Sequence, residues 1–300
     1  MTLQHYASTG IGRSLRQVMH ALRSDDATIA EYVATRAQRL QRDQERMARA
    51  LGRRVDDSDI LIVGPGPYMV EPRFFGRNNK VTAVDLDVLP SGWGPGPYLQ
   101  MWRMNGFGRF AKTVGRKILG VDRRHARAWQ RELKVARLED PILIQGDILQ
   151  GPPREHAFDI AACWSVFQHL AEPAVAIRHM KAALRPGGVL YFGIHLFTSN
   201  TGHHDIRAFT GAAGGLPPWA HLRASTAGQV NSSAWLNKLR LRDWRALLHE
   251  HAPAYEEYRE TYDDEARTLL TPGIRSELAG YDDEELLTVD VFFLWRKPIV

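Results

Sequence analysis

The sequence predicts an α/β fold built on a doubly wound, mostly parallel β-sheet. Short apolar runs alternate with helical patterns, and each run ends in glycine or polar residues, as expected for successive strand–helix–strand units. The five runs are Ile60–Val63, Val81–Val84, Ile142–Ile144, Ile160–Cys163 and Val189–Ile194. Because ligands collect at the carboxyl ends of parallel strands, we expect the functional site where these runs end.

Helices are predicted before the first strand, where residues 1–56 form an N-terminal helical segment and residues 57–300 the main domain. Residues 24–51 carry apolar side chains at helical spacing, begin with Ser24, Asp25 and Asp26 as capping residues, and stop at Gly52. We expect residues 1–51 to cover the ligand pocket or to form a dimer contact.

Two further segments distinguish the chain. Residues 88–141, between the second and third strands, form a long basic insertion, and residues 197–240, after the fifth strand, are rich in Gly, Pro, His, Ser and Asn and predict an irregular lid. A helix is expected at Leu241–His251. Strands at Tyr255–Thr261 and Val289–Trp295, with a helical stretch between them, would complete a seven-stranded sheet whose last strand is antiparallel.

Composition is that of a globular protein, with 44% hydrophobic and 24% charged residues in 300. No apolar run has the length of a transmembrane segment and no signal peptide is visible, so we expect a cytoplasmic location. The single cysteine, Cys163, excludes an internal disulfide and a CxxC pair. A net charge of +5 is modest for a dedicated nucleic-acid binder, which makes nucleic acid a disfavoured partner.

The strand ends carry a cofactor pattern. Gly64-Pro65-Gly66 follows the first strand, where glycines let a backbone approach a ligand closely. Asp85 ends the second strand 21 positions after Gly64, where a carboxylate can accept both hydroxyls of a ribose. This pair alone fits an NAD site as well as other adenosine-containing cofactors.

The order of the motifs resembles the class I S-adenosylmethionine-dependent methyltransferase family, whose domain is Rossmann-like. The resemblance rests on five points in residues 60–195: Ile60 to Gly66, Val84-Asp85-Leu86-Asp87, Gln145-Gly146-Asp147, Phe158-Asp159 to Gln168-His169-Leu170, and Leu184-Arg185-Pro186-Gly187-Gly188, of which the last is mainly a turn.

By this resemblance the glycine loop holds the amino-acid part of the methyl donor, Asp85 the ribose, and Asp147 with Ile148 the adenine. The donor-binding set that it implies is Gly64, Pro65, Gly66, Asp85, Leu86, Asp147, Ile148 and Trp164. The family pattern has an acid where this chain has Ile62, and a glycine where it has Tyr68, so we expect the amino-acid end of the donor to be held differently.

Three side chains are candidates for the chemistry. His195 and His169 follow the fifth and fourth strands, and an alcohol acceptor needs a base to remove its proton. Either histidine can instead be structural. Asp205, beside His203 and His204 in the lid, can contact the acceptor or supply an oxygen to a divalent ion, although we assign no metal site.

The predicted function is O-methylation of a hydroxyl on a small molecule or glycan, because the lid and the insertion would enclose such an acceptor. The basic insertion is a solvated helical face, a site for phosphates on the acceptor, or a contact with an anionic membrane surface. Alternatives are a methyltransferase acting on RNA or another nucleic acid, and a non-catalytic donor-binding protein. Cys163-Trp164-Ser165-Val166 replaces the Asn/Asp-Pro-Pro-Tyr/Phe motif of base N-methylation, and Met69 replaces the third glycine of an NAD site. A homodimer is a further possibility.

Overall fold

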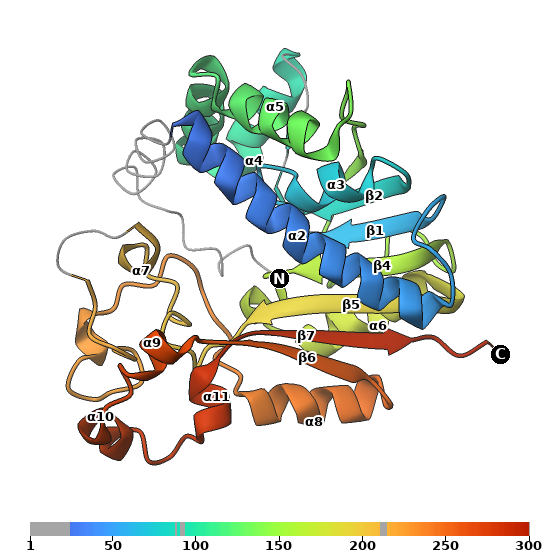
Figure 1. Cartoon of the computed structure of the whole chain (residues 1–300). Helices are drawn as coiled ribbons and strands as arrows, with labels where there is room; N and C mark the ends of the chain where they lie inside the picture. Colours follow the sequence, from blue (N-terminus) through green and yellow to red (C-terminus); the bar gives the residue numbers. More distant parts are fainter. Residues whose placement is uncertain (1–24, 88, 91–93, 211–214, 300) are drawn as a thin grey trace. The chain divides into compact units, whose positions relative to one another are not determined.

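The structure is a computed structural model that describes residues 25–87, 89–90, 94–210 and 215–299. The strands form one seven-stranded sheet in the order β3-β2-β1-β4-β5-β7-β6 (Figure 1). Their bounds are β1 Asp59–Val63, β2 Lys80–Asp85, β3 Ile142–Gln145, β4 Phe158–Trp164, β5 Leu184–His195, β6 Glu256–Thr261 and β7 Thr288–Arg296. β1 pairs in parallel with β2 and β4, β2 pairs in parallel with β3, and β6 pairs antiparallel with β7. The predicted doubly wound α/β sheet with an antiparallel strand is confirmed.

The helices follow the expected alternation. Their bounds are α2 Asp26–Leu51, α3 Val70–Phe75, α4 Pro95–Ile118, α5 Val121–Leu133, α6 Pro173–Ala183, α7 Arg207–Thr210, α8 Leu241–His251, α9 Asp264–Arg267, α10 Pro272–Glu277 and α11 Asp283–Leu287. Short 3-10 turns occupy Phe167–His169 and Ala227–Gln229. The insertion after β2 is therefore helical, in α4 and α5, as its basic pattern predicted.

The described residues divide into two compact units. The N-terminal unit comprises residues 25–163, 175–191 and 296–299, and the C-terminal unit comprises residues 164–174 and 192–295. β1, β2 and β3 lie wholly within the N-terminal unit, whereas β6 and α8 lie wholly within the C-terminal unit.

Within the N-terminal unit, the central strands β1 and β4 are buried on both faces. Ile60, Leu61 and Ile62 of β1 and Ile160 to Cys163 of β4 are each at most 1% exposed. Parallel strands covered by helices on both faces lack a solvent side, which explains the continuous apolar runs in the sequence.

Helix α2 is a long helix that runs along the N-terminal unit (Figure 1). It begins at Asp25, whose side chain accepts a hydrogen bond from the Thr28 amide, and ends at Gly52 in the left-handed conformation, as the capping pattern predicted. Arg124 of α5 forms an ion pair with Asp26 at 2.7 Å, and the Tyr191 hydroxyl of β5 donates to Asp43 at 2.5 Å. Residues 1–24 of the predicted helical segment lie outside the described residues.

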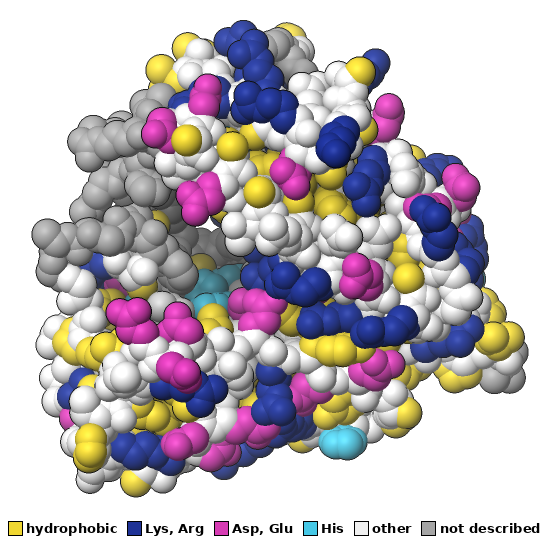
Figure 2. Space-filling model, viewed as in Figure 1, with side chains coloured by type: hydrophobic (Ala, Val, Ile, Leu, Met, Phe, Trp, Pro, Cys, Tyr) yellow, Lys and Arg dark blue, Asp and Glu magenta, His cyan; other side chains and the backbone are white. Residues whose placement is uncertain are grey.

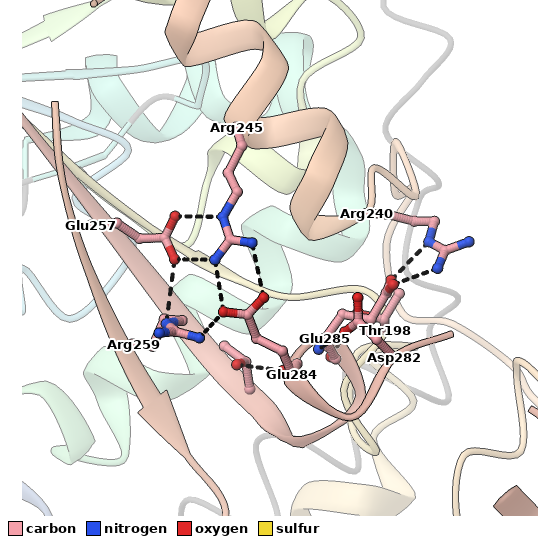
Figure 3. A network of polar contacts seen from close by, with 9 residues as sticks. Thr198, Arg240, Arg245, Glu257, Arg259, Asp282, Glu284 and Glu285 are labelled. Carbon is pink, nitrogen blue, oxygen red and sulfur yellow. Dashed lines mark hydrogen bonds and ion pairs between the residues drawn. The ribbon is translucent and has the colours of Figure 1, made fainter. Parts of the chain in front are cut away.

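The C-terminal unit is fastened by ion pairs between α8, β6 and α11 (Figure 3). Arg245 of α8 donates to Glu257 of β6 at 2.8 Å and to Glu284 of α11 at 2.9 Å, and Arg259 also pairs with Glu284. Arg240 donates to the buried Glu285 at 2.8 Å. Several charges that share partners hold a geometry better than isolated surface pairs do, so these elements form a stable frame for the irregular segment 197–240.

The largest difference from the predicted bounds is at the start of β5. β5 begins at Leu184 rather than Val189, so the Pro186-Gly187-Gly188 turn is absorbed into an irregular start of the strand. Hydrogen bonds explain the extension, because the Gly187 amide donates to the Lys297 carbonyl and the Lys297 amide donates to the Gly188 carbonyl. In the described part of the chain, the helices lack the combination of length and apolar character needed to cross a bilayer.

Candidate active site

Three of the predicted motifs meet at one edge of the N-terminal unit. The Gly64 amide donates to the Val84 carbonyl at 2.8 Å, and the Gly146 amide donates to the Asp85 carbonyl at 2.9 Å. The loops after β1, β2 and β3 are thus joined through their backbones. The parallel register carries Gly64, Asp85 and Asp147 to the same carboxyl edge, as the sequence predicted.

The glycine loop leaves open space at this edge. Gly66 has a φ of +64°, which disfavours side chains, and a Cβ built on it meets no atom within 4 Å. The two departures from the family pattern are structural: Ile62 is buried in β1 at 1% exposure, and Tyr68 stacks on His125 of α5 at 4.5 Å between ring centroids. Tyr68 therefore anchors the loop to the insertion.

Asp85 is a largely buried carboxylate at the end of β2. Burial raises the pKa of Asp85 to about 6, while the Arg109 guanidinium and the Gly66 N–H act in the opposite direction. The Asp87 amide donates to the Asp85 carboxylate at 2.9 Å, and Asp87 itself pairs with Arg109 and accepts from Asn105 at 2.7 Å. The insertion thus places a cation close to the strand end, and a ligand hydroxyl would favour the charged form of Asp85.

The other residues predicted to bind the donor are buried, half-buried or engaged in contacts within the protein. One oxygen of Asp147 accepts from the Leu149 amide at 2.9 Å and shapes its own turn. Ile148 is 4% exposed, and its carbonyl contacts His179 Nδ1 at 2.7 Å. Leu86 and Trp164 are half-buried, and Trp164 ends β4 next to Cys163, which pairs with Val63.

In the C-terminal unit, His195 lies in a chain of polar contacts. His195 Nδ1 lies 3.0 Å from the Asp290 carboxylate, and Nε2 lies 2.9 Å from the Thr201 hydroxyl. The Thr201 hydroxyl in turn lies 3.3 Å from the Tyr262 hydroxyl. A carboxylate accepts and cannot donate, so hydrogen bonding assigns the proton to Nδ1 and leaves Nε2 as the basic nitrogen. The turn that follows β5 requires glycine at position 202, because a Cβ there would lie 2.2 Å from the Phe197 carbonyl oxygen.

Other histidines surround His195 in the same unit. The His204 ring meets those of His169 and His195 edge-on, each at 5.1 Å between centroids, and His169 Nδ1 contacts the Trp235 carbonyl at 2.8 Å. Burial, reinforced by the neighbouring histidines, lowers the pKa of His204 to about 3; burial also lowers the pKa of His221 to about 4. The imidazoles of His204 and His221 are therefore neutral at pH 7 and weak proton acceptors, which leaves His195 as the better candidate for the base.

Asp205 is held by hydrogen bonds within its own segment. Its side chain is buried at 1% exposure and accepts from the Arg207 guanidinium at 2.7 Å and from the Asn231 amide at 2.8 Å. Burial raises the pKa of Asp205, but these hydrogen bonds outweigh it and hold the pKa at about 2. The carboxylate thus fastens the segment after His204. Among the described residues, no three His, Cys, Asp or Glu side chains come together as a metal-binding group.

Gln168 was missed by the sequence reasoning. Its side chain is 3% exposed, yet neither its amide oxygen nor its amide nitrogen has a hydrogen-bond partner among the described residues. A buried amide without partners costs free energy unless a ligand or water satisfies it. Its position directly before His169, in the 3-10 turn that follows β4, was the available signal.

Comparison with known proteins bears on the family. Residues 91–192 match a family model described as a methyltransferase domain. This match covers about a third of the chain and supports its assignment to the class I S-adenosylmethionine-dependent methyltransferases. An uncharacterized 37.1 kDa protein in a transposon of Streptomyces fradiae is 31% identical over 126 residues, which are 39% of this chain and 34% of that protein. The chain therefore matches about a third of the length of this relative.

Solved structures with a similar arrangement include the phosphoethanolamine N-methyltransferase 2 of Haemonchus contortus, in complex with phosphomonomethylethanolamine and S-adenosylhomocysteine. It is 13% identical, with a TM-score of 0.46 over 86% of this chain and 52% of that chain. The YcgJ protein of Bacillus subtilis is 16% identical, with a TM-score of 0.40 over 83% of this chain and 98% of that chain.

The residues at the N-terminal unit's edge fit the cofactor of a class I methyltransferase, S-adenosylmethionine. The open space at Gly66 admits a close ligand, and the buried Asp85 carboxylate has capacity for the hydroxyls of a ribose. Bound there, the donor supplies a methyl group on a positively charged sulfur.

Proposed function

We propose that this methyltransferase methylates a hydroxyl oxygen of a small molecule or glycan, with His195 as the general base. The polar chain Asp290–His195–Thr201 carries the proposal, because it presents an imidazole whose Nε2 already contacts an alcohol oxygen at 2.9 Å. That is the hydrogen bond a base makes with an alcohol before it removes the proton.

In this proposal Asp85 holds the donor's ribose, Gly64, Pro65 and Gly66 approach its amino-acid part, and Asp147 with Ile148 borders its adenine. Leu86 and Trp164 add half-buried apolar surface. The family assignment supports this side of the proposal, and so does the joining of the three loops at one edge.

His195 would take the acceptor's proton on Nε2 as the oxygen becomes nucleophilic. The Nδ1–H donates to Asp290, which fixes the tautomer and stabilises the imidazolium that forms. Thr201 holds Nε2 until the acceptor's hydroxyl replaces its own, and Tyr262 then remains as a partner for the Thr201 hydroxyl.

Gln168 and His169 are proposed as acceptor contacts. The buried Gln168 amide offers two N–H donors and one carbonyl acceptor, which suits a ligand with several hydroxyls. His169 is the next residue, and its Nδ1 contacts the Trp235 carbonyl. This contact favours a positioning role for His169 over a role as the base.

A nucleic-acid acceptor is less favoured by the charges of the insertion. Several of its arginines are neutralised within the protein: Arg109 by Asp87, Arg116 by Asp122 and Arg124 by Asp26. Figure 2 shows Lys and Arg side chains mixed with Asp and Glu over the part of the molecule where α2, α4 and α5 lie. This face is therefore not uniformly basic, whereas binding to the phosphate backbone of a nucleic acid favours a surface rich in Lys and Arg.

The test is transfer of a labelled methyl group from S-adenosylmethionine to a panel of hydroxyl-bearing metabolites and oligosaccharides, with RNA as a separate arm. Once an acceptor is found, His195→Gln should lower turnover by about 10² to 10⁴ while donor affinity stays within about threefold. His249→Gln, at an exposed position of α8, is the matched control. Wild-type turnover in His195→Gln would remove His195 as the base, and methylation of RNA alone would overturn the acceptor class.

A further inference from the structure

The insertion encloses a cavity that the proposed methyl transfer does not use. It has a volume of about 450 Å³ and lies within the N-terminal unit, lined by α3, α4, α5, β3, the end of the loop after β1 and the segments that precede β3 and follow β2. None of the residues assigned to the donor lines it. Its volume is within the usual range for small-molecule sites.

The walls of this insertion cavity combine apolar surface with cations. Pro67, Met69, Leu89, Met101 and Leu143 are among its apolar lining residues. Arg73, Arg116, Lys117 and Arg137 contribute positive charge, and Asp122, Glu139 and Asp140 negative charge.

Most of these charges are already engaged or face water. Arg116 is 5% exposed and pairs with Asp122 at 2.7 Å, and Lys117 donates to the Pro90 carbonyl at 3.0 Å. Glu139 and Asp140 are exposed, so water weakens the effect of their charges without abolishing it. Arg73 is the exception.

Arg73 Nη1 is buried and has no hydrogen-bond partner among the described residues. Burial lowers the pKa of Arg73, and so does the charge of Arg116, whereas Asp122 and Asp140 raise it. A guanidinium remains charged in a protein, and a buried N–H of a charged group costs more free energy when it is left without an acceptor than a neutral one does. An oxyanion is the ligand that best satisfies it.

We propose that the insertion cavity binds a small organic anion, with a carboxylate or phosphate on Arg73 and an apolar body against Met69, Leu89 and Leu143. This site is separate from the donor and from the acceptor hydroxyl. Arg73 supplies the hydrogen-bond donor, and the apolar walls favour ligands with a hydrocarbon part over inorganic anions.

Calorimetry with hexanoate, hexyl phosphate and 1-hexanol tests the proposal on the full chain. At least one of the two anions should bind ten or more times more tightly than hexanol, and comparison of the two identifies the preferred head group. Arg73→Met keeps much of the side-chain volume and should reduce anion binding at least tenfold without strengthening hexanol binding. Arg127→Met, an exposed position on α5 that does not line the cavity, removes the same charge and should leave binding unchanged.

Ala126→Phe provides a second variant should Arg73→Met fail to fold, because it fills the cavity from α5 and should block all ligands. Equal binding of anions by wild type and either cavity variant, or no binding of any probe by wild type, overturns the proposal. Titration of S-adenosylmethionine in the same preparations reports on the donor site independently, so failure of one site is distinguishable from failure of the other.

Discussion

Donor binding should weaken as the pH falls below about 6, because Asp85 must be ionised to accept the ribose hydroxyls. The pKa of Asp85 in the free protein is about 6, raised mainly by burial. Two hydroxyl donors stabilise the charged carboxylate and lower this pKa in the complex. Donor binding is therefore strongest above pH 6 and is lost as Asp85 takes up a proton.

The magnitude follows from the fraction of Asp85 that is ionised. At pH 7.5 the free protein is almost fully ionised at this position, whereas at pH 5 only about one molecule in eleven is. The dissociation constant for S-adenosylmethionine should thus rise about tenfold between pH 7.5 and pH 5, which is about 1.4 kcal/mol. Calorimetric titration at half-unit pH intervals measures it.

Asp85→Asn is the control that assigns the effect. The amide is similar in size but has no charge to lose, so its affinity for the donor should be weak and nearly constant between pH 5 and pH 7.5. A wild-type affinity that does not change over this range, or an equal pH dependence in Asp85→Asn, would show that Asp85 does not hold the donor.

Three further predictions concern stability. Gln168→Met should raise the free energy of unfolding of the free protein by about 1 to 2 kcal/mol in urea denaturation, because it removes a buried amide without partners; a loss of stability would mean that the amide is structural. The pKa of His204 is about 3 in the folded protein, against an ordinary value of 6.5. The free energy of unfolding should therefore decrease as the pH falls below 6.5, by about 2 kcal/mol at pH 5. His204→Asn tolerates the left-handed backbone at this position and should remove that part of the acid sensitivity; identical pH profiles would contradict it. Tyr191→Phe should lower the free energy of unfolding by about 1 to 3 kcal/mol, because the buried Asp43 loses a hydrogen bond. An unchanged midpoint of thermal unfolding would argue against this contact.

Much of the fold could be predicted from the sequence because its central strands are buried on both faces. Ile60–Val63 and Ile160–Cys163 have no polar side to interrupt the apolar run, and glycine or acidic residues mark where each strand ends. α8 has the predicted bounds for a similar reason, since Trp244 and Leu248 lie on its buried face and polar residues on the other. The predicted start of β5 was wrong because the Gly187 amide donates to the carbonyl of Lys297, more than a hundred positions later in the sequence.

The candidate site was predictable only where neighbours in sequence define it. The glycine loop, Asp85 and Asp147 each end a strand, so strand order alone placed them at one edge. The partners of His195 could not be found in this way, because Asp290 is 95 positions away and Tyr262 reaches Thr201 across 61 positions. The role of Asp205 also depends on a distant group, the Asn231 amide, which no local pattern reveals.

The most direct test of the account is a crystal structure of the protein with S-adenosylhomocysteine. The ribose hydroxyls should lie within hydrogen-bond distance, about 3 Å, of the Asp85 carboxylate, with the amino-acid part of the ligand at Gly64 and Gly66. A ligand bound elsewhere in the chain, or a ribose that makes no contact with Asp85, would contradict the assignment of the donor site.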